Sequence, residues 1–178
     1  MYGLELELKK NLLRFNADDD EFDHKISGGL NISLLQTVQD LDTQKVTDET
    51  DYSANFTFDS SKLTGASDVL VNTDLTYFKA FDKDHSLQTT LAYNYFSDQL
   101  NTIGTLKKGN VIDKSFNTLD LIIKSKLKNL NISLSAKNLL NPSIERVQEV
   151  YETPGISEVT LSEFKRGVNI NLSVGFRF

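Results

Sequence analysis

The last twelve residues, GVNINLSVGFRF, constrain the fold of this chain more than any other stretch. Apolar and polar residues alternate through all of it, and successive side chains of a β-strand point to opposite faces. One face would carry Val168, Ile170, Leu172, Val174, Phe176 and Phe178, and the other Gly167, Asn169, Asn171, Ser173, Gly175 and Arg177. Such a strand either covers a core on one face or separates lipid from a wet lumen.

The same alternation recurs along the chain, so we predict an all-β, antiparallel up-and-down meander of about seven strands. The predicted strands cover residues 1–10, 26–39, 68–81, 86–99, 116–127 and 130–140, and a last strand whose start lies between Val159 and Phe164. The connections near 79–86 and 128–130 are short, that at 10–25 is intermediate, and those at 40–67, 97–115 and 141–158 are long loops. Short turns at one rim and long loops at the other are typical of an outer-membrane barrel.

Composition narrows the class of protein. No stretch of about 20 apolar residues exists, which excludes a helical membrane protein, whereas a barrel strand devotes only alternate positions to lipid. The net charge of -6 and the pI near 4.9 argue against a nucleic-acid partner, which would require a basic face. With no Cys, the chain offers neither a disulfide framework nor a thiolate site.

No residue pattern indicates catalysis, a cofactor or a metal site, and we expect that the chain is not an enzyme. The acidic run Asp18, Asp19, Asp20, Glu21 and Asp23 contains no glycine of the kind a calcium loop needs, so we interpret it as a solvated turn. The two histidines, His24 and His85, fall in connections on the short-turn rim, where no pocket for a general base is expected.

Three ordered motifs resemble the last strands of a TonB-dependent outer-membrane receptor. The first is a Leu-x-Gly-x-Ser segment that leads into a strand carrying an Asn. The second is an Asn-Leu-Phe-Asn element in which Leu140 replaces the usual Phe. The third is a terminal aromatic residue. The matching positions are Leu63, Gly65, Ser67 and Asn72, then Asn138, Leu139 and Asn141, and finally Phe178.

The resemblance implies a bacterial outer-membrane location and a receptor that captures a ligand outside the cell and imports it with energy from the inner membrane. The family's ligands include iron chelates, cobalamin, oligosaccharides and peptides. The implied partners are outer-membrane lipid, the rest of the barrel and its plug, an inner-membrane energy-coupling protein and the barrel-assembly machinery. Phe178, Phe176 and Val174 resemble the signal that this machinery reads.

Family members build roughly 22 strands around a plug, so residues 1–178 would be one region, the C-terminal part of a barrel that is open on its own. We find no plug, energy-coupling box or secretory signal in it and expect a fragment. Two alternatives remain open: a complete outer-membrane barrel of about eight strands, and a soluble β-sandwich that acts as a binding module.

Further roles follow from the same interpretation. Tyr52, Phe56 and Phe58 in the first long loop are candidates for stacking on a ligand in an outer vestibule, although a loop that packs on itself is the favoured interpretation of these rings. Four aromatic residues suit a girdle at the membrane interfaces, namely Tyr77, Tyr93, Tyr95 and Phe176. The expected lumen groups are Glu5, Glu7, Asp74, Asp120, Lys124, Lys126 and Lys137.

Overall fold

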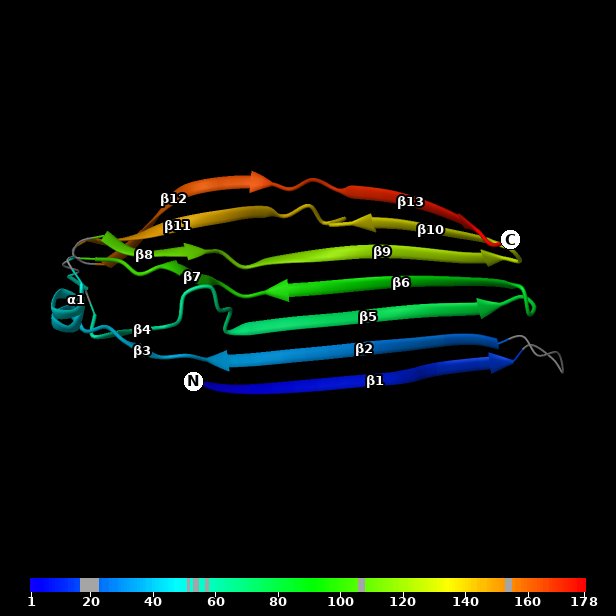
Figure 1. Ribbon diagram of the computed structural model, residues 1–178, viewed down its shortest axis with the longest axis horizontal. Coiled ribbons are helices and arrows are strands. Elements are labelled where there is room, and N and C mark those ends of the chain that lie inside the picture. Colours follow the sequence, from blue (N-terminus) through cyan, green and yellow to red (C-terminus); the bar gives the residue numbers. More distant parts are fainter. Residues whose placement is uncertain (17–22, 51, 53–54, 57, 106–107, 153–154) are drawn as a thin grey trace.

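Seven long strands lie side by side in one twisted sheet (Figure 1). The computed structural model describes residues 1–16, 23–50, 52, 55–56, 58–105, 108–152 and 155–178. The strands of this main sheet, in spatial order, are β1 (Tyr2–Asn16), β2 (Asp23–Gln36), β5 (Val69–Ala80), β6 (His85–Phe96), β9 (Phe116–Leu127), β10 (Leu130–Lys137) and β13 (Asn169–Phe176). All neighbours are antiparallel, and the sheet is not closed. The predicted fold class and seven-strand meander are confirmed.

Beyond one end of the main sheet lies a smaller set of elements, at the left of Figure 1. Four strands form a second sheet in the order β12 (Gly155–Lys165), β11 (Ser143–Glu152), β8 (Lys108–Asp113) and β7 (Gln99–Thr102). A two-stranded ribbon joins β3 (Gln39–Asp40) to β4 (Ser60–Ser61), and α1 (Thr43–Glu49) is a short helix between them. The described residues contain no helix long and apolar enough to cross a bilayer.

The prediction of long loops at 97–115 and 141–158 is wrong, because both stretches form strand hairpins. In β11 the polar residues Glu145 and Glu149 flank Val147, so neither face of the strand is consistently apolar and the sequence alternation is masked. The prediction that the last strand starts between Val159 and Phe164 is also wrong. Those residues belong to β12, and β13 begins only after Gly167, whose positive φ of 82° interrupts the strand.

Two other boundaries differ from the prediction. The first connection is shorter than expected, because β1 continues to Asn16 through a register shift between Asn11 and Leu13. The sixth strand ends at Lys137 rather than at residue 140, because Asn138 takes a positive φ of 60°.

The two faces of the main sheet have opposite character, as the alternation predicted. The register places the following apolar residues on one face: Leu4, Leu6, Leu8, Ile26, Leu30, Ile32, Leu34, Val69, Val71, Leu75, Tyr77, Leu87, Leu91, Tyr93, Tyr95, Leu119, Leu121, Ile123, Leu130, Ile132, Leu134, Ile170, Leu172, Val174 and Phe176. We call this the apolar face and the opposite one the polar face.

No second layer covers the apolar face among the described residues. Among the described residues the only buried hydrophobic residue is Val147, which lies in β11 of the second sheet. On the apolar face, Leu6 is 56% exposed and Leu172 is 64% exposed. A soluble sandwich would bury such a face against a second sheet. The described part of the chain therefore does not have the architecture of the sandwich alternative.

Candidate functional site

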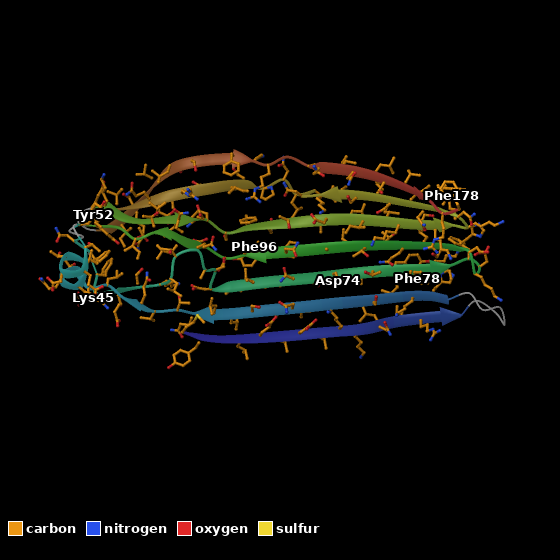
Figure 2. All side chains as sticks on the ribbon, in the orientation of Figure 1. Lys45, Tyr52, Asp74, Phe78, Phe96 and Phe178 are labelled. Carbon is orange, nitrogen blue, oxygen red and sulfur yellow. The ribbon has the colours of Figure 1, made fainter. Side chains whose placement is uncertain are left out.

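The polar face turns aromatic where the main sheet meets the second sheet. Phe96 ends β6 and Phe116 begins β9 directly opposite it, and both lie on the polar face because Asn94 and Thr118 pair two residues away. Their rings stack with centroids 4.9 Å apart and planes 17° apart. Figure 2 labels Phe96 at this junction.

A cavity of about 400 Å³ lies over this aromatic pair, and we call it the junction pocket. It is lined by Ser67, Phe96, Ser97, Gln99, Asp113, Lys114, Phe116, Ile144, Arg146, Ser162, Phe164 and Arg166. These residues come from β6, β7, β8, β9, β11 and β12 and their connections, so the pocket exists only because the second sheet continues the first.

One cation of the pocket, Arg146, is fully engaged with a carboxylate. Its Nε donates to Oδ1 of Asp113 at 2.5 Å and its Nη2 donates to Oδ2 at 3.0 Å, a forked geometry that suits a guanidinium. Asn101 Nδ2 adds a bond to the same carboxylate at 3.0 Å. The hydrogen bond from Arg146 lowers the pKa of Asp113, burial opposes the shift and Asn101 adds to it. Asp113 therefore stays ionised and holds Arg146 against the pocket wall.

A second cation, Lys114, is also paired. Its Nζ lies 3.0 Å from Asp98 and 3.3 Å from Glu158, so it joins the β6–β7 connection to β12. The hydrogen bond to Asp98 raises the pKa of Lys114 against the effect of burial. Lys114 is therefore charged at neutral pH, and the two carboxylates beside it carry one negative charge more than it offsets.

The third cation, Arg166, has no such partner. Its guanidinium lies over the Phe116 ring, 6.0 Å from the centroid, and it forms no ion pair with any residue that the structure describes. Of the three cations that line the junction pocket, Arg166 is thus the one without an ion pair among the described residues.

Two asparagines fix the backbone beside Arg166. Asn138 Nδ2 donates to the carbonyl of Gly167 at 2.8 Å, and the amide of Gly167 donates to Oδ1 of Asn141 at 2.9 Å. The amide of Asn138 itself donates to Asp120 Oδ1, and that of Leu139 donates to the carbonyl of Leu119. The predicted motif positions Asn138, Leu139 and Asn141 therefore lie together, where they tie β9, β10 and the β12–β13 junction to one another.

The other motif positions also lie at a junction. Gly65, with a positive φ of 76°, donates its amide to the carbonyl of Leu100 and accepts a bond from Gln99 Nε2 at 2.6 Å. Ser67 is buried and bridges Gln99, and the amide of Leu63 donates to Thr37 Oγ1 at 3.0 Å. This segment docks the chain that enters β5 onto β7.

Asn72 belongs to a row of amides on the polar face. It pairs with Asn31 on β2 and with Asn94 on β6. Asn94 donates to Thr118 Oγ1 at 3.1 Å, and Asn31 donates to Glu5 Oε1 at 2.8 Å.

The predicted vestibule residues do not gather in the junction pocket. Tyr52 is 79% exposed near α1, at the far end of the molecule from Phe178 (Figure 2). Phe56 forms an isolated bridge with Thr105, and Phe58 packs edge-on against Tyr151 at 5.9 Å. Phe58 also lines a second cavity of about 570 Å³, which shares Val69 and Tyr95 with the apolar face.

The C-terminal aromatics lie on the free edge of β13. Phe176 and Phe178 pack edge-on with centroids 5.4 Å apart, and Val174 and Phe176 are each 61% exposed. Their predicted role in assembly stays a prediction.

Neither polar cluster named from the sequence forms a described site. Residues 17–22, which hold most of the acidic run, lie outside the described residues, and the described residues contain no group suited to a metal ion. His24 and His85 lie at the predicted short-turn rim, but within the first residues of β2 and β6 rather than in connections. His24 bonds to Tyr77 Oη at 2.8 Å and His85 to Asp82 at 2.6 Å.

Sequence reasoning missed the junction pocket because its arginines lie in stretches that were predicted to be loop or of uncertain boundary. One signal was available, since Phe96 and Phe116 place rings on the face that carries mostly polar residues along both strands. Comparison of the chain with protein-family models, curated proteins and solved structures finds no match.

Proposed function

We propose that this chain is part of the wall of a transmembrane β-barrel in a bacterial outer membrane, and that the barrel is a TonB-dependent receptor. The complete receptor captures a scarce ligand from outside the cell and imports it with energy relayed from the inner membrane. The observation that carries the proposal is the wide apolar face, which no described element covers.

The apolar face suits lipid in composition and height. It runs across all seven strands of the main sheet, and β5, β6 and β9 have 12 residues each. A tilted strand of about 9–11 residues crosses the hydrocarbon core of a bilayer. Lys10 and Lys79 are exceptions, since their register opposite Gly28 and Leu87 places them on the apolar face. Lys10 stands on an edge strand and Lys79 is the penultimate residue of β5, and the long aliphatic stem of each lets its ammonium reach a polar interface.

The two rims suit the two sides of an outer membrane. At one rim β5 and β6 are joined through residues 81–84, and β9 and β10 through residues 128–129. At the other rim the chain makes hairpins and a short helix that extend well beyond the main sheet (Figure 1). Barrels of this class have short periplasmic turns and longer extracellular connections. The junction pocket then faces the outer mouth of the lumen.

Both edges of the main sheet are free, and their direction favours a larger barrel over a small one. In an antiparallel meander of seven strands, β1 and β13 run the same way. Direct pairing of β13 with β1 would therefore be parallel, whereas bacterial barrels are antiparallel with an even number of strands. An odd number of further strands completes such a ring, which disfavours the alternative of a complete small barrel formed by these strands alone. Unpaired edges in lipid would otherwise cost several kcal/mol for each backbone group.

The assignment to TonB-dependent receptors rests on the motif positions. Leu63, Gly65 and Ser67 lie at one junction, and Asn138 and Asn141 at another, where the wall passes into its outer extension. The proposed partners are the remaining barrel and plug, lipid, the assembly machinery and, through the plug, the energy-coupling protein.

Single-cysteine labelling tests the membrane part of the proposal, because residues 1–178 contain no Cys. Leu134→Cys and Ser135→Cys place a dye on opposite faces of β10. In the protein extracted from its host and reconstituted in vesicles, brominated lipid should quench the dye at 134 and aqueous iodide the dye at 135. Equal quenching at the two positions would rule out a lipid-facing sheet.

Uptake tests the receptor part. A host strain that lacks the gene should lose energy-dependent uptake of one ligand among labelled iron chelates, cobalamin, oligosaccharides and peptides, and the intact gene should restore it. Unchanged uptake of every ligand in the panel would contradict a receptor.

A further inference from the structure

We infer that the junction pocket binds the anionic, ring-bearing part of a ligand, with Arg166 as its charge contact and Phe96 and Phe116 as its apolar floor. This inference rests on the proposed function for the route by which a ligand arrives, and it narrows the ligand class to organic anions with a planar group.

The charged residues that line the pocket favour an anionic ligand. Arg146 is held by Asp113, and Lys114 is held by Asp98 and Glu158, whereas Arg166 has no carboxylate partner among the described residues. The residues that line the pocket include three cations and one carboxylate, Asp113, although the chain as a whole has a net charge of -6. A guanidinium binds a carboxylate or phosphate through parallel N–H donors, while a cationic ligand would be repelled.

The floor of the pocket selects a planar group. Phe96 and Phe116 form a half-buried stack, and Phe164 adds a third ring to the lining. Aromatic rings prefer offset or edge-on contact with another ring at centroid separations of about 4.5–7 Å. An anion with an attached ring therefore gains contacts from Arg166 and from the stack together, which a small inorganic anion does not.

Hydrogen bonds to the next residue hold the backbone beside Arg166 in place. Both polar groups of Gly167, the next residue, are held by Asn138 and Asn141 at 2.8 and 2.9 Å. Because these bonds hold the backbone beside Arg166, the main chain does not have to be ordered when a ligand binds. Asn138 and Asn141 are thus positioning residues for Arg166.

The second cavity provides a contrast within the same chain. It is the larger of the two, but its lining includes Asp68, Asp98 and Glu149 and one cation, Lys62, which pairs with Asp68. Its charge disfavours an organic anion. Of these two cavities, the junction pocket is the one that suits such a ligand.

The test compares two probes that differ in charge, para-fluorobenzoate and para-fluorobenzyl alcohol. Fluorine NMR titrations follow each probe with the full chain in detergent micelles, and partition into micelles cancels when variants are compared. We expect para-fluorobenzoate to bind the native chain in a saturable manner. Arg166→Gln should weaken its binding roughly tenfold and leave the binding of the alcohol unchanged.

Arg177→Gln is the matched control, since Arg177 lies on the polar face at the opposite end of β13. It should change neither titration. Arg166→Lys keeps the charge and should retain most of the benzoate affinity, whereas Phe116→Leu should weaken both probes. The inference is overturned if benzoate shows no saturable binding, if Arg166→Gln weakens both probes equally, or if Arg177→Gln matches Arg166→Gln.

Failure of this inference differs from failure of the proposed function. Charge-selective binding together with equal dye quenching at positions 134 and 135 would support the anion site and contradict the membrane location. Quenching by lipid at position 134 and by iodide at position 135, without charge-selective binding, would support the membrane location and contradict the anion site.

Discussion

At the scale of single residues, Gly109 determines how closely β8 and β11 approach. It is buried, and a Cβ added to it would lie 2.5 Å from both the Cβ and the carbonyl oxygen of Glu149. Because the carbonyl belongs to the backbone, the strand must shift to accommodate a methyl group.

Gly109→Ala should therefore destabilise the second sheet by about 1–3 kcal/mol, the usual cost of overpacking. Hydrogen exchange of the β8 and β11 amides measures the change. Gly155→Ala is the control, because a Cβ there meets nothing within 4 Å and the backbone conformation is ordinary. Exchange rates in Gly109→Ala equal to those of the control would show that the close approach does not matter.

Asp113 gives the second sheet a defined acid sensitivity. The hydrogen bond from Arg146 lowers its pKa in the folded state below that of the unfolded chain. A depressed carboxyl pKa contributes stability above the unfolded value of about 4, and this stability is lost as the pH falls through the folded value.

We expect amide protection in β8 and β11, corrected for intrinsic exchange rates, to fall as the pH drops below about 4. Asp113→Asn should be less protected at neutral pH and should lose less protection on acidification. Some acid sensitivity should remain from Asp98. Burial raises the pKa of Asp98, but Lys114 and the amide of Ser115 lower it overall. Identical pH profiles for the native chain and Asp113→Asn would contradict a role for this ion pair.

At the scale of elements, the arrangement of the two sheets depends on how the chain passes from a strand of one into a strand of the other. The chain passes from β12 to β13 at Gly167, where a φ of 82° turns the backbone. The side chain of Asn138 bonds to the carbonyl of Gly167 and that of Asn141 to its amide. Asn138 and Asn141 themselves take positive φ, which asparagine tolerates better than most residues.

Gly167→Ala should destabilise this passage by about 1–2 kcal/mol, because a side chain disfavours positive φ. Asn138→Ala should cost about 1 kcal/mol for the lost hydrogen bond. Exchange at the amides of Asn169 and Ile170 reports both changes. Gly175→Ala in the same strand is the control, since its added Cβ meets nothing within 4 Å. An effect of Gly175→Ala as large as that of Gly167→Ala would contradict a specific role for the positive φ of Gly167 and for the two asparagine hydrogen bonds.

The sequence predicts the main sheet well and its outer extension poorly, and the reason is physical. Strands such as β6 and β13 face two different surroundings, so each alternates between apolar and polar residues. Three strands of the second sheet, β8, β11 and β12, carry charged and apolar residues on both faces, as β11 does around Val147, and the alternation disappears. The Arg166 site depends on contacts between distant residues, and no local pattern encodes such contacts.

At the scale of the whole molecule, the two faces must meet different surroundings, because one sheet separates them without a second layer. Leu172 and Asn171 are neighbours at the centre of β13 with side chains on opposite faces. Arginine at the lipid-facing midplane of a barrel costs about 2–4 kcal/mol, and on the lumen face far less. In the proposed barrel, Leu172→Arg should therefore reduce the yield of folded protein in lipid vesicles strongly, and Asn171→Arg only slightly. Both variants add the same charge to the same strand, so a general effect of charge would lower the two yields alike and would contradict the membrane wall.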